Sequence, residues 1–323
     1  MPENDTLNEK LAFVEGRYHD FDELSEQVAG WNVDLKQLET GELTASVSQI
    51  LSPELAIGRA RFDRRCLQGG SAPAGHRTIA LLDTGSSPAV FCGQIFDAQN
   101  LVHYGDAGEV VCTSQPGFNV LTLSVPDDFL ERQAELHGFV PPRNLLPQTT
   151  RVTDCNPLAL KRLRLRLKRL ADLPKAPETR EAAPRMLTQS VDELGGSLLS
   201  LFHDCGHDRN RTAATGNKQR MLRRARSYIA ENLADPVTVS SLAMALGVTT
   251  RTIEYLFRDS LDITPSEYIR TTRLHAFRQA LKLAHPSRKI NEIAQEIGYW
   301  HMGQLARDYR YRFGELPSQT RRR

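Results

Sequence analysis

Two stretches near the C-terminus, residues 239–265 and 290–317, repeat one spacing of small, apolar and proline residues. In each stretch an alanine precedes a glycine by four positions, two apolar residues four apart follow, and a proline comes eight positions after the second of them. The second copy has one extra residue after its glycine. The matched residues are Ala243, Gly247, Ile253, Phe257 and Pro265 in the first copy, and Ala294, Gly298, Leu305, Tyr309 and Pro317 in the second.

This spacing predicts two helix-turn-helix units. A small residue lets two short helices approach where they cross, glycine tolerates the positive φ of a tight turn, and the apolar pair fixes the second helix against the first. The other face of that second helix is then free to enter a DNA major groove. We expect a helix over about residues 266–284 to join the two units. The alternative is two structural helical hairpins with no DNA role, and two copies in register disfavour it.

The sequence over about residues 219–320 resembles the AraC/XylS class of transcription regulators. The resemblance rests on TVSSLAMALGVTTRTIEYLFRDSLDITPSEYIRTTRLHAFRQAL and INEIAQEIGYWHMGQLARDYRYRFGELPSQT. It implies two recognition helices in successive major grooves, and because the copies are unequal we expect an asymmetric site with halves about one helical turn apart. Asp262 stands where that class commonly has glycine, and we expect aspartate to tolerate the turn.

The helical wheel assigns DNA contacts to two groups of side chains. Arginine can pair with guanine and glutamate can accept from cytosine, whereas other arginines hold phosphates and set the register. For each residue taken alone, the alternative is a solvated helix surface. The expected base contacts are Arg251, Glu254, Tyr255, Trp300, His301, Gln304 and Arg307, and the expected phosphate contacts are Arg258, Arg270, Arg273, Arg310 and Arg312.

Charge is distributed unevenly along the chain. The net charge of the 323 residues is +2, yet from Lys218 to Arg323 there are 19 Lys and Arg against 10 Asp and Glu. This basic third favours a polyanionic partner, although a solvated basic face is the alternative. No apolar run approaches the roughly 20 residues of a membrane span, and the N-terminus lacks the pattern of a secretory signal. We therefore expect a cytoplasmic protein with no membrane contact.

The N-terminal part predicts an antiparallel β-barrel or sandwich, cupin-like in outline. Short apolar runs separated by turn-rich pieces fill residues 43–126, and helical patterns follow over residues 127–138 and 158–173. The expected fold class is therefore α+β, with an all-α C-terminal domain. The expected division is a ligand-sensing domain over 1–172, a linker and dimerisation helix over 173–217, and the DNA-binding domain over 218–323.

A periodic apolar stripe within the middle segment favours a homodimer seam, with burial in the core of the same chain as the alternative. Its residues are Leu187, Val191, Leu194, Leu198, Leu199 and Phe202. The five cysteines form no CxxC pair, so we expect reduced thiols and no metal. Nothing in residues 1–180 has a catalytic pattern, and His76 alone does not make a metal site. An enzyme is therefore disfavoured, and no cofactor is expected.

The resemblance implies an effector-binding domain ahead of the linker, as many regulators of this class have. Four arginines in GRARFDRRCLQGG, namely Arg59, Arg61, Arg64 and Arg65, suit an anionic effector such as cyclic di-GMP, because guanidinium groups chelate phosphates and stack on bases. The alternative is an exposed basic strand edge that discourages aggregation. The sequence thus predicts an effector-controlled activator that binds promoter DNA and RNA polymerase. Alternatives are a repressor, an effector-independent regulator, an architectural DNA binder and a protein-interaction module.

Overall fold

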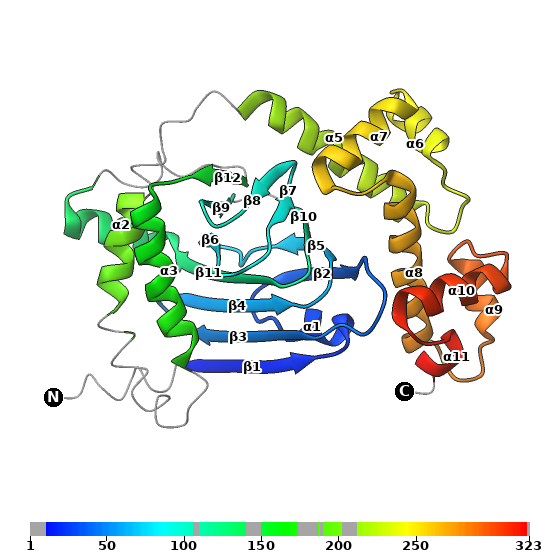
Figure 1. Cartoon of the computed structure of the whole chain (residues 1–323), viewed down its shortest axis with the longest axis horizontal. Helices are drawn as coiled ribbons and strands as arrows, with labels where there is room; N and C mark the ends of the chain where they lie inside the picture. Colours follow the sequence, from blue (N-terminus) through cyan, green and yellow to red (C-terminus); the bar gives the residue numbers. More distant parts are fainter. Residues whose placement is uncertain are drawn as a thin grey trace.

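The computed structural model describes residues 11–105, 110–139, 150–173, 187, 190–201 and 212–321. A β-rich N-terminal domain extends to residue 201, and an all-helical C-terminal domain begins at residue 212. The two lie side by side (Figure 1). This arrangement confirms the predicted α+β fold class.

Seven strands form the larger antiparallel sheet, in the order β1-β3-β4-β11-β6-β9-β12. They are β1 (Ala12–Tyr18), β3 (Ala45–Leu51), β4 (Ala56–Phe62), β6 (His76–Leu82), β9 (Asn100–Tyr104), β11 (Phe118–Pro126) and β12 (Arg151–Asp154). The central strand β11 places Leu121 opposite Arg59 of β4 and Leu81 of β6. Because successive side chains alternate between faces, this sheet has one face toward the helices and one toward a second sheet.

Five strands form that second sheet, in the order β2-β5-β10-β7-β8. They are β2 (Asn32–Gln37), β5 (Cys66–Ser71), β7 (Ala89–Phe91), β8 (Gln94–Phe96) and β10 (Val110–Ser114). Aromatic side chains from both sheets, including Phe62, Phe91 and Phe118, are buried in the core between them. Within the described residues both sheets are open, so the arrangement is a sandwich and not a closed barrel.

Helices cover the outer face of the seven-stranded sheet. They are α2 (Asp127–His137), α3 (Pro157–Ala171) and the helical residues 190–201. The α2 helix ends as expected at Gly138, whose φ is 69°, and Asn156 caps α3 by accepting hydrogen bonds from the backbone of Leu158 and Ala159. Both predicted helices are therefore confirmed.

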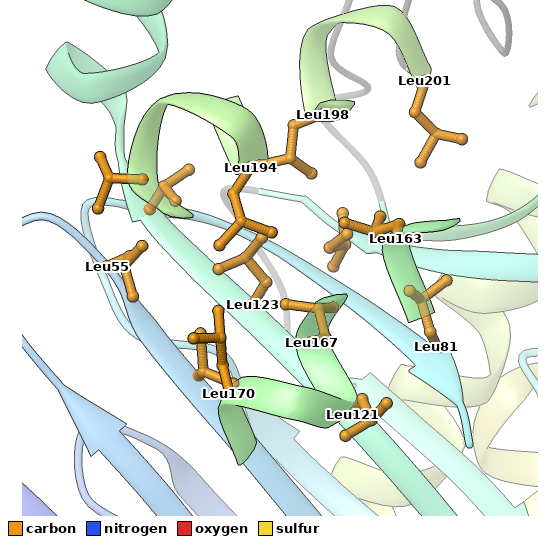
Figure 2. Close-up of a cluster of buried hydrophobic side chains, with 14 of the residues drawn as sticks. Leu55, Leu81, Leu121, Leu123, Leu163, Leu167, Leu170, Leu194, Leu198 and Leu201 are labelled. Atoms are coloured by element: carbon orange, nitrogen blue, oxygen red, sulfur yellow. The ribbon is translucent and has the colours of Figure 1, made fainter. Parts of the chain in front are cut away.

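The leucine stripe of residues 190–201 faces the core of its own chain. Leu194 and Leu198 lie over Leu163 and Leu167 of α3 and over leucines of the sheet (Figure 2). Leu187, Val191 and Leu199 are buried in the same cluster, whereas Phe202 lies outside the described residues. The structure therefore favours burial in the core of the same chain over a dimer seam, because these side chains already have apolar partners within the chain.

Two further expectations concern cysteines and membranes. Cys66, Cys92 and Cys112 are free thiols, but Cys155 is disulfide-bonded, so the expectation of reduced thiols fails there. Among the described residues, no group of His, Cys, Asp and Glu could hold a metal ion. No helix in the same residues has the length and apolarity to cross a membrane.

The C-terminal domain contains α5 (Thr212–Glu231) and two helix-turn-helix units joined by one long helix. The first unit is α6 (Val239–Leu246) and α7 (Thr250–Leu261), the joining helix is α8 (Pro265–Leu283), and the second unit is α9 (Ile290–Glu296) and α10 (Met302–Phe313). The short helix α11 (Pro317–Thr320) closes the domain. The predicted repeat and its connecting helix are confirmed.

Candidate nucleic-acid interface and its contacts with the N-terminal domain

Local sequence sets the geometry of the first helix-turn-helix unit. Thr238 caps α6 together with Ser241, and Thr249 caps α7 by accepting from the backbone of Thr252. Gly247 lies between the helices at φ 69°, in the left-handed region that glycine enters without strain. Asp262 ends α7 at φ 55°, so aspartate does take the left-handed turn as expected.

The second unit has its own turn glycine. Gly298 has a φ of 78°, and a Cβ there would lie 2.8 Å from the carbonyl oxygen of Leu233 and 2.9 Å from that of Ala234. The turn therefore needs glycine both for its backbone conformation and for its close approach to the end of α5. Ala294 is fully buried beneath α10, where a small residue lets the two helices approach.

Each unit has a core that extends onto α8. Ile253, Leu256 and Phe257 of α7 are buried with Tyr268 and Ile269 of α8. Further along α8, Leu274, Phe277 and Leu281 are buried with Leu305 and Tyr309 of α10. Both recognition helices are thus packed against one continuous helix, which fixes their separation.

The side chains expected to contact bases are mostly exposed, and they lie on or just before α7 and α10. Arg251, Tyr255, His301, Gln304 and Arg307 are exposed, and the Trp300 side chain is 67% exposed. Its indole is therefore accessible to a partner. Glu254 is partly buried.

Several of these side chains bond along their own helices. The Oε2 atom of Glu254 lies 3.7 Å from Nε of Arg258, one helical turn later. Arg307 donates to Gln304 at 2.9 Å, and Gln304 donates to Asp308 at 2.7 Å. Such bonds orient the polar groups of the exposed face before any DNA contact is made.

The five arginines expected at phosphates differ in accessibility. Arg258, Arg270 and Arg310 are exposed. Arg273 is partly buried and donates to the backbone carbonyls of Leu233 (3.3 Å) and Asp235 (2.9 Å). Arg273 therefore holds the segment after α5.

Arg312 is not on the expected surface. It is 3% exposed and donates to the carbonyl of Gln37 (3.1 Å) and to the hydroxyl of Thr271 (3.3 Å). The reason is its helical position, because residues 305, 309 and 312 share the buried face of α10. The prediction that Arg312 contacts a phosphate is therefore wrong. Its guanidinium group is buried and points toward the N-terminal domain.

The N-terminal domain holds α8 through a group of charged side chains that we call the clamp: Asp20, Asp22, Arg278 and Lys282. Asp20 caps the helix α1 (Phe21–Gln27), and Asp22 lies in its first turn. Arg278 is 5% exposed and donates to Asp20 at 3.2 Å and to Asp22 at 2.9 Å. Lys282 contacts both carboxylates, and Glu315 lies 3.4 Å from Arg278.

A second set of contacts reaches the end of α7. Arg65 donates to the side chain of Asp262 at 2.9 Å and to its carbonyl at 2.6 Å. The backbone nitrogen of Gly93 donates to the carbonyl of Ser260 at 3.1 Å. Both recognition helices are therefore contacted by the N-terminal domain near their C-terminal ends. Sequence reasoning missed these contacts, since its only signal was the acidic start of α1.

Asp20 gives the clamp a measurable pH dependence. Burial alone would raise its pKa, but hydrogen bonds from Lys282 and Arg278 outweigh this and lower the pKa to about 2, from the ordinary 3.8. A carboxyl group whose pKa is lower in the folded protein adds stability above its ordinary pKa, and that stability is lost as the pH falls through about 2.

We therefore expect Asp20→Asn to lower the free energy of unfolding at pH 7 by about 1 kcal/mol, a figure discounted for solvent screening. Asparagine can still cap α1, so the loss reports the charge and not the helix. Urea titrations at pH 7 and near pH 2 measure it, and the difference between the two proteins should shrink at the lower pH. Glu54→Gln, at an exposed loop position, is the charge-matched control. A difference that persists near pH 2 contradicts the assignment.

The arginine cluster of the N-terminal domain is divided among different partners. Arg59 is buried and pairs with Asp83 (3.0 Å) and with Asp172. Arg65 bonds Asp262, and Arg64 donates to the carbonyl of Glu42 at 3.2 Å. Arg61 lines an open groove of about 370 Å³ together with Arg17. The structure does not bring the four guanidinium groups to one site.

A different cavity lies between the two sheets. Its volume is about 100 Å³, and its lining is mainly apolar and aromatic, with Trp31, Phe91 and Tyr104 among the wall residues. Polar groups are few, and they include Gln49 and Gln68. Leu24 of helix α1 and Val28, which caps the helix, form part of the wall. Mainly apolar walls with a few polar groups are typical of small-molecule sites.

Comparisons with known proteins concern mainly the C-terminal domain. The model of a helix-turn-helix domain family matches residues 242–323. The probable thc operon regulatory protein of Rhodococcus erythropolis is 34% identical over 103 residues, which are 32% of this chain and 31% of that protein. The XylDLEGF operon transcriptional activator of Pseudomonas putida is 39% identical over 98 residues, 29% of this chain and 30% of that protein. The chain thus spans about a third of the length of these curated relatives.

Among solved structures, the AraC-like transcriptional activator CuxR is 15% identical with a TM-score of 0.43, and the match covers 88% of this chain and 100% of that one.

Proposed function

We propose that the C-terminal domain is a DNA-binding domain of the AraC/XylS family and that the whole protein is a sequence-specific transcription regulator, with support from the helix-turn-helix match and from the relative in Pseudomonas putida. The observation that carries the proposal is the pair of recognition helices packed on one helix, α8, with exposed side chains such as Arg251 on α7 and Arg307 on α10. Two helices fixed in this way can enter successive major grooves of promoter DNA. An architectural binder has no need of two ordered recognition helices. Binding to chromosomal DNA would place the protein in the cytoplasm.

Selection from a pool of randomised DNA duplexes tests this proposal. The full chain should enrich one asymmetric site, with two unlike halves about one helical turn apart. Competition between the enriched duplex and random DNA then gives the specificity ratio. Retention of the pool without enrichment would favour an architectural binder, and no retention would favour a protein-interaction module.

Arg307 and Arg310 separate base reading from phosphate contact. We expect Arg307→Ala to weaken binding by about 1 to 3 kcal/mol at the enriched site, with the loss concentrated at one or two base positions. Arg310→Ala should weaken binding to all sequences alike and reduce the salt dependence of affinity. Both residues are exposed on α10, so each serves as the other's control. Equal losses for Arg307→Ala on specific and random duplexes contradict the assignment.

We further propose that the protein is an activator that recruits RNA polymerase. Support comes from the relative in Pseudomonas putida, which is named as a transcriptional activator. A reporter gene placed downstream of the enriched site tests the direction of regulation. A rise in expression supports activation, and a fall supports a repressor.

We propose, finally, that a small effector bound in the N-terminal domain controls the regulator, and the cavity between the sheets supports this. The hypothesis of an anionic effector such as cyclic di-GMP has less support, because Arg59 and Arg65 already have carboxylate partners. Its remaining support is the groove lined by Arg61 and Arg17. Calorimetry with cyclic di-GMP on the wild type and on Arg61→Ala tests it, and heat that is lost in the variant would favour this ligand.

A further inference from the structure

Helix α1 lies on the side of the N-terminal domain that faces the C-terminal domain (Figure 1), and it contributes to the wall of the cavity between the sheets. Leu24 and Val28, one turn apart, line the cavity. The contacts with α8 are made at the N-terminal end of α1, by Asp20, Phe21 and Asp22. One short helix thus contacts α8 at its start and lines the cavity further along.

The part of α1 that lines the cavity is held by buried contacts and hydrogen bonds. Leu24 is 1% exposed, in the core between the sheets. The side chain of Gln49, on β3, accepts from the backbone nitrogen of Ala29 at 3.0 Å and donates to the carbonyl of the same residue at 3.1 Å. Gln49 is itself a wall residue of the cavity. A change in the shape of the cavity therefore acts on α1 at both Leu24 and the chain just after the helix.

The N-terminal end of α1 contacts the second helix-turn-helix unit. The ring of Phe21 lies 4.4 Å from that of His275 and 5.8 Å from that of Phe313, measured between centroids. The guanidinium carbon of Arg278 lies 4.9 Å from the centre of the Phe21 ring and 5.4 Å from that of Phe313. Phe313 is the last residue of α10. A movement of α1 would therefore displace the side chains that it contacts on α8 and at the end of the second recognition helix.

The first helix-turn-helix unit is held by other elements. Arg65, which contacts the end of α7, lies in the turn before β5, and Gly93 lies between β7 and β8. These contacts do not pass through α1. A displacement of α1 would therefore change the hold of the N-terminal domain on the second unit while the contacts of the first unit stay in place, which changes how the two units are presented to successive grooves.

We propose that α1 transmits occupancy of the inter-sheet cavity to the second helix-turn-helix unit, and that the occupant is a compact, mainly apolar and uncharged molecule. The size of the cavity, about 100 Å³, limits the occupant to roughly the scale of one aromatic ring. Its nearest permanent charge, on Arg59, is already balanced by Asp83 and Asp172. The inference rests on the proposed regulator function and adds the route by which the effector acts.

A double-mutant cycle in the full chain tests this route. Val47→Phe fills the cavity from β3, and Leu24→Ala removes the contact of α1 with it. Each is combined with Asp20→Asn/Asp22→Asn, which removes the clamp charges that hold α8 while keeping a capping residue at position 20. Affinity for the DNA site enriched by selection is the readout. The pair Glu54→Gln/Glu135→Gln removes the same charge from exposed positions away from α8 and is the matched control.

We expect each cavity substitution alone to change the dissociation constant roughly fivefold or more, the scale of an ordinary allosteric coupling. In the clamp-free background the same substitution should change it less than about twofold, whereas in the control background the full effect should persist. Equal effects in all three backgrounds overturn the proposal. Hydrogen exchange at α8, faster in both cavity variants only when the clamp is intact, gives a second readout that needs no DNA.

Failure of the proposed regulator function can be distinguished from failure of the route through α1. If the wild type binds no duplex selectively, the proposed regulator function fails before the cycle begins. If the wild type binds selectively but the cycle is additive, the regulator function stands and the route through α1 is wrong. Val47→Phe and Leu24→Ala change the packing in opposite ways, so loss of folding in one leaves the other to decide.

Discussion

Replacing Arg59 with methionine is expected to lower the free energy of unfolding by about 3 to 5 kcal/mol. Arg59 is 3% exposed, and its partner Asp83 is 2% exposed. The guanidinium group also contacts Asp172, which joins the end of α3 to β4. Without the Arg59 guanidinium group, the ion-pair partner left to the buried Asp83 is Lys168, whose Nζ lies 3.4 Å from Oδ2 of Asp83. A buried carboxylate that loses its main partner pays most of its desolvation cost without compensation.

Arg61→Met is the matched control, because Arg61 lies two residues along the same strand and lines an open groove. We expect its free energy of unfolding to change by less than about 1 kcal/mol. Urea unfolding followed by circular dichroism measures both variants. Similar losses in the two would mean that the ion pair of Arg59 with Asp83 contributes little. A loss of ligand affinity in Arg59→Met without any loss of stability would instead favour the role first expected for it in anion binding.

The helix-turn-helix units could be predicted because their signals are local. The alanine and glycine of each unit are four positions apart, and the helix face that each residue occupies follows from spacings of three and four. The left-handed turn at Asp262 also follows from its own chemistry, since aspartate enters that region more readily than most residues. The same local rule would have placed Arg312 on the buried face with Leu305 and Tyr309, had it been applied there.

Long-range partners could not be predicted. Arg59 meets Asp172 from 113 positions away, and Arg312 meets Gln37 from 275 positions away. A basic strand such as GRARF has the same appearance in sequence whether its arginines are exposed, bind an anion or pair with distant carboxylates. The clamp has the same difficulty, because nothing in the acidic start of α1 identifies Arg278 as its partner.

Strand prediction failed where the strand pattern is weak. The glycine-rich strand β5, CLQGGS, has the composition of a turn, and its conformation comes from pairing with both β2 and β10. Strand β12 has four residues at the edge of the larger sheet, too few for a pattern to be visible. The longer apolar runs of β3, β4, β6 and β11 were predicted because alternation over several residues is a strong signal.

Shortening a leucine in the stripe of residues 190–201 is expected to destabilise the protein strongly. Leu198 is 1% exposed and Leu194 is fully buried, in the cluster that also contains Leu163 and Leu167 (Figure 2). We expect Leu198→Ala to lower the free energy of unfolding by about 3 to 5 kcal/mol, because it removes buried methyl groups and leaves a cavity in the core. Urea unfolding of the full chain measures the loss.

The control and the concentration dependence together decide between core and dimer seam. Leu165→Ala, on the solvent side of α3 where the leucine is 50% exposed, should change stability far less. The loss in Leu198→Ala should be the same at low and at high protein concentration, since the partners of Leu198 belong to its own chain. A dimer seam behaves differently, because mass action makes the unfolding midpoint of a dimer rise with concentration. A midpoint that rises with concentration in the wild type but not in Leu198→Ala would restore the stripe as an interface between two copies of this chain.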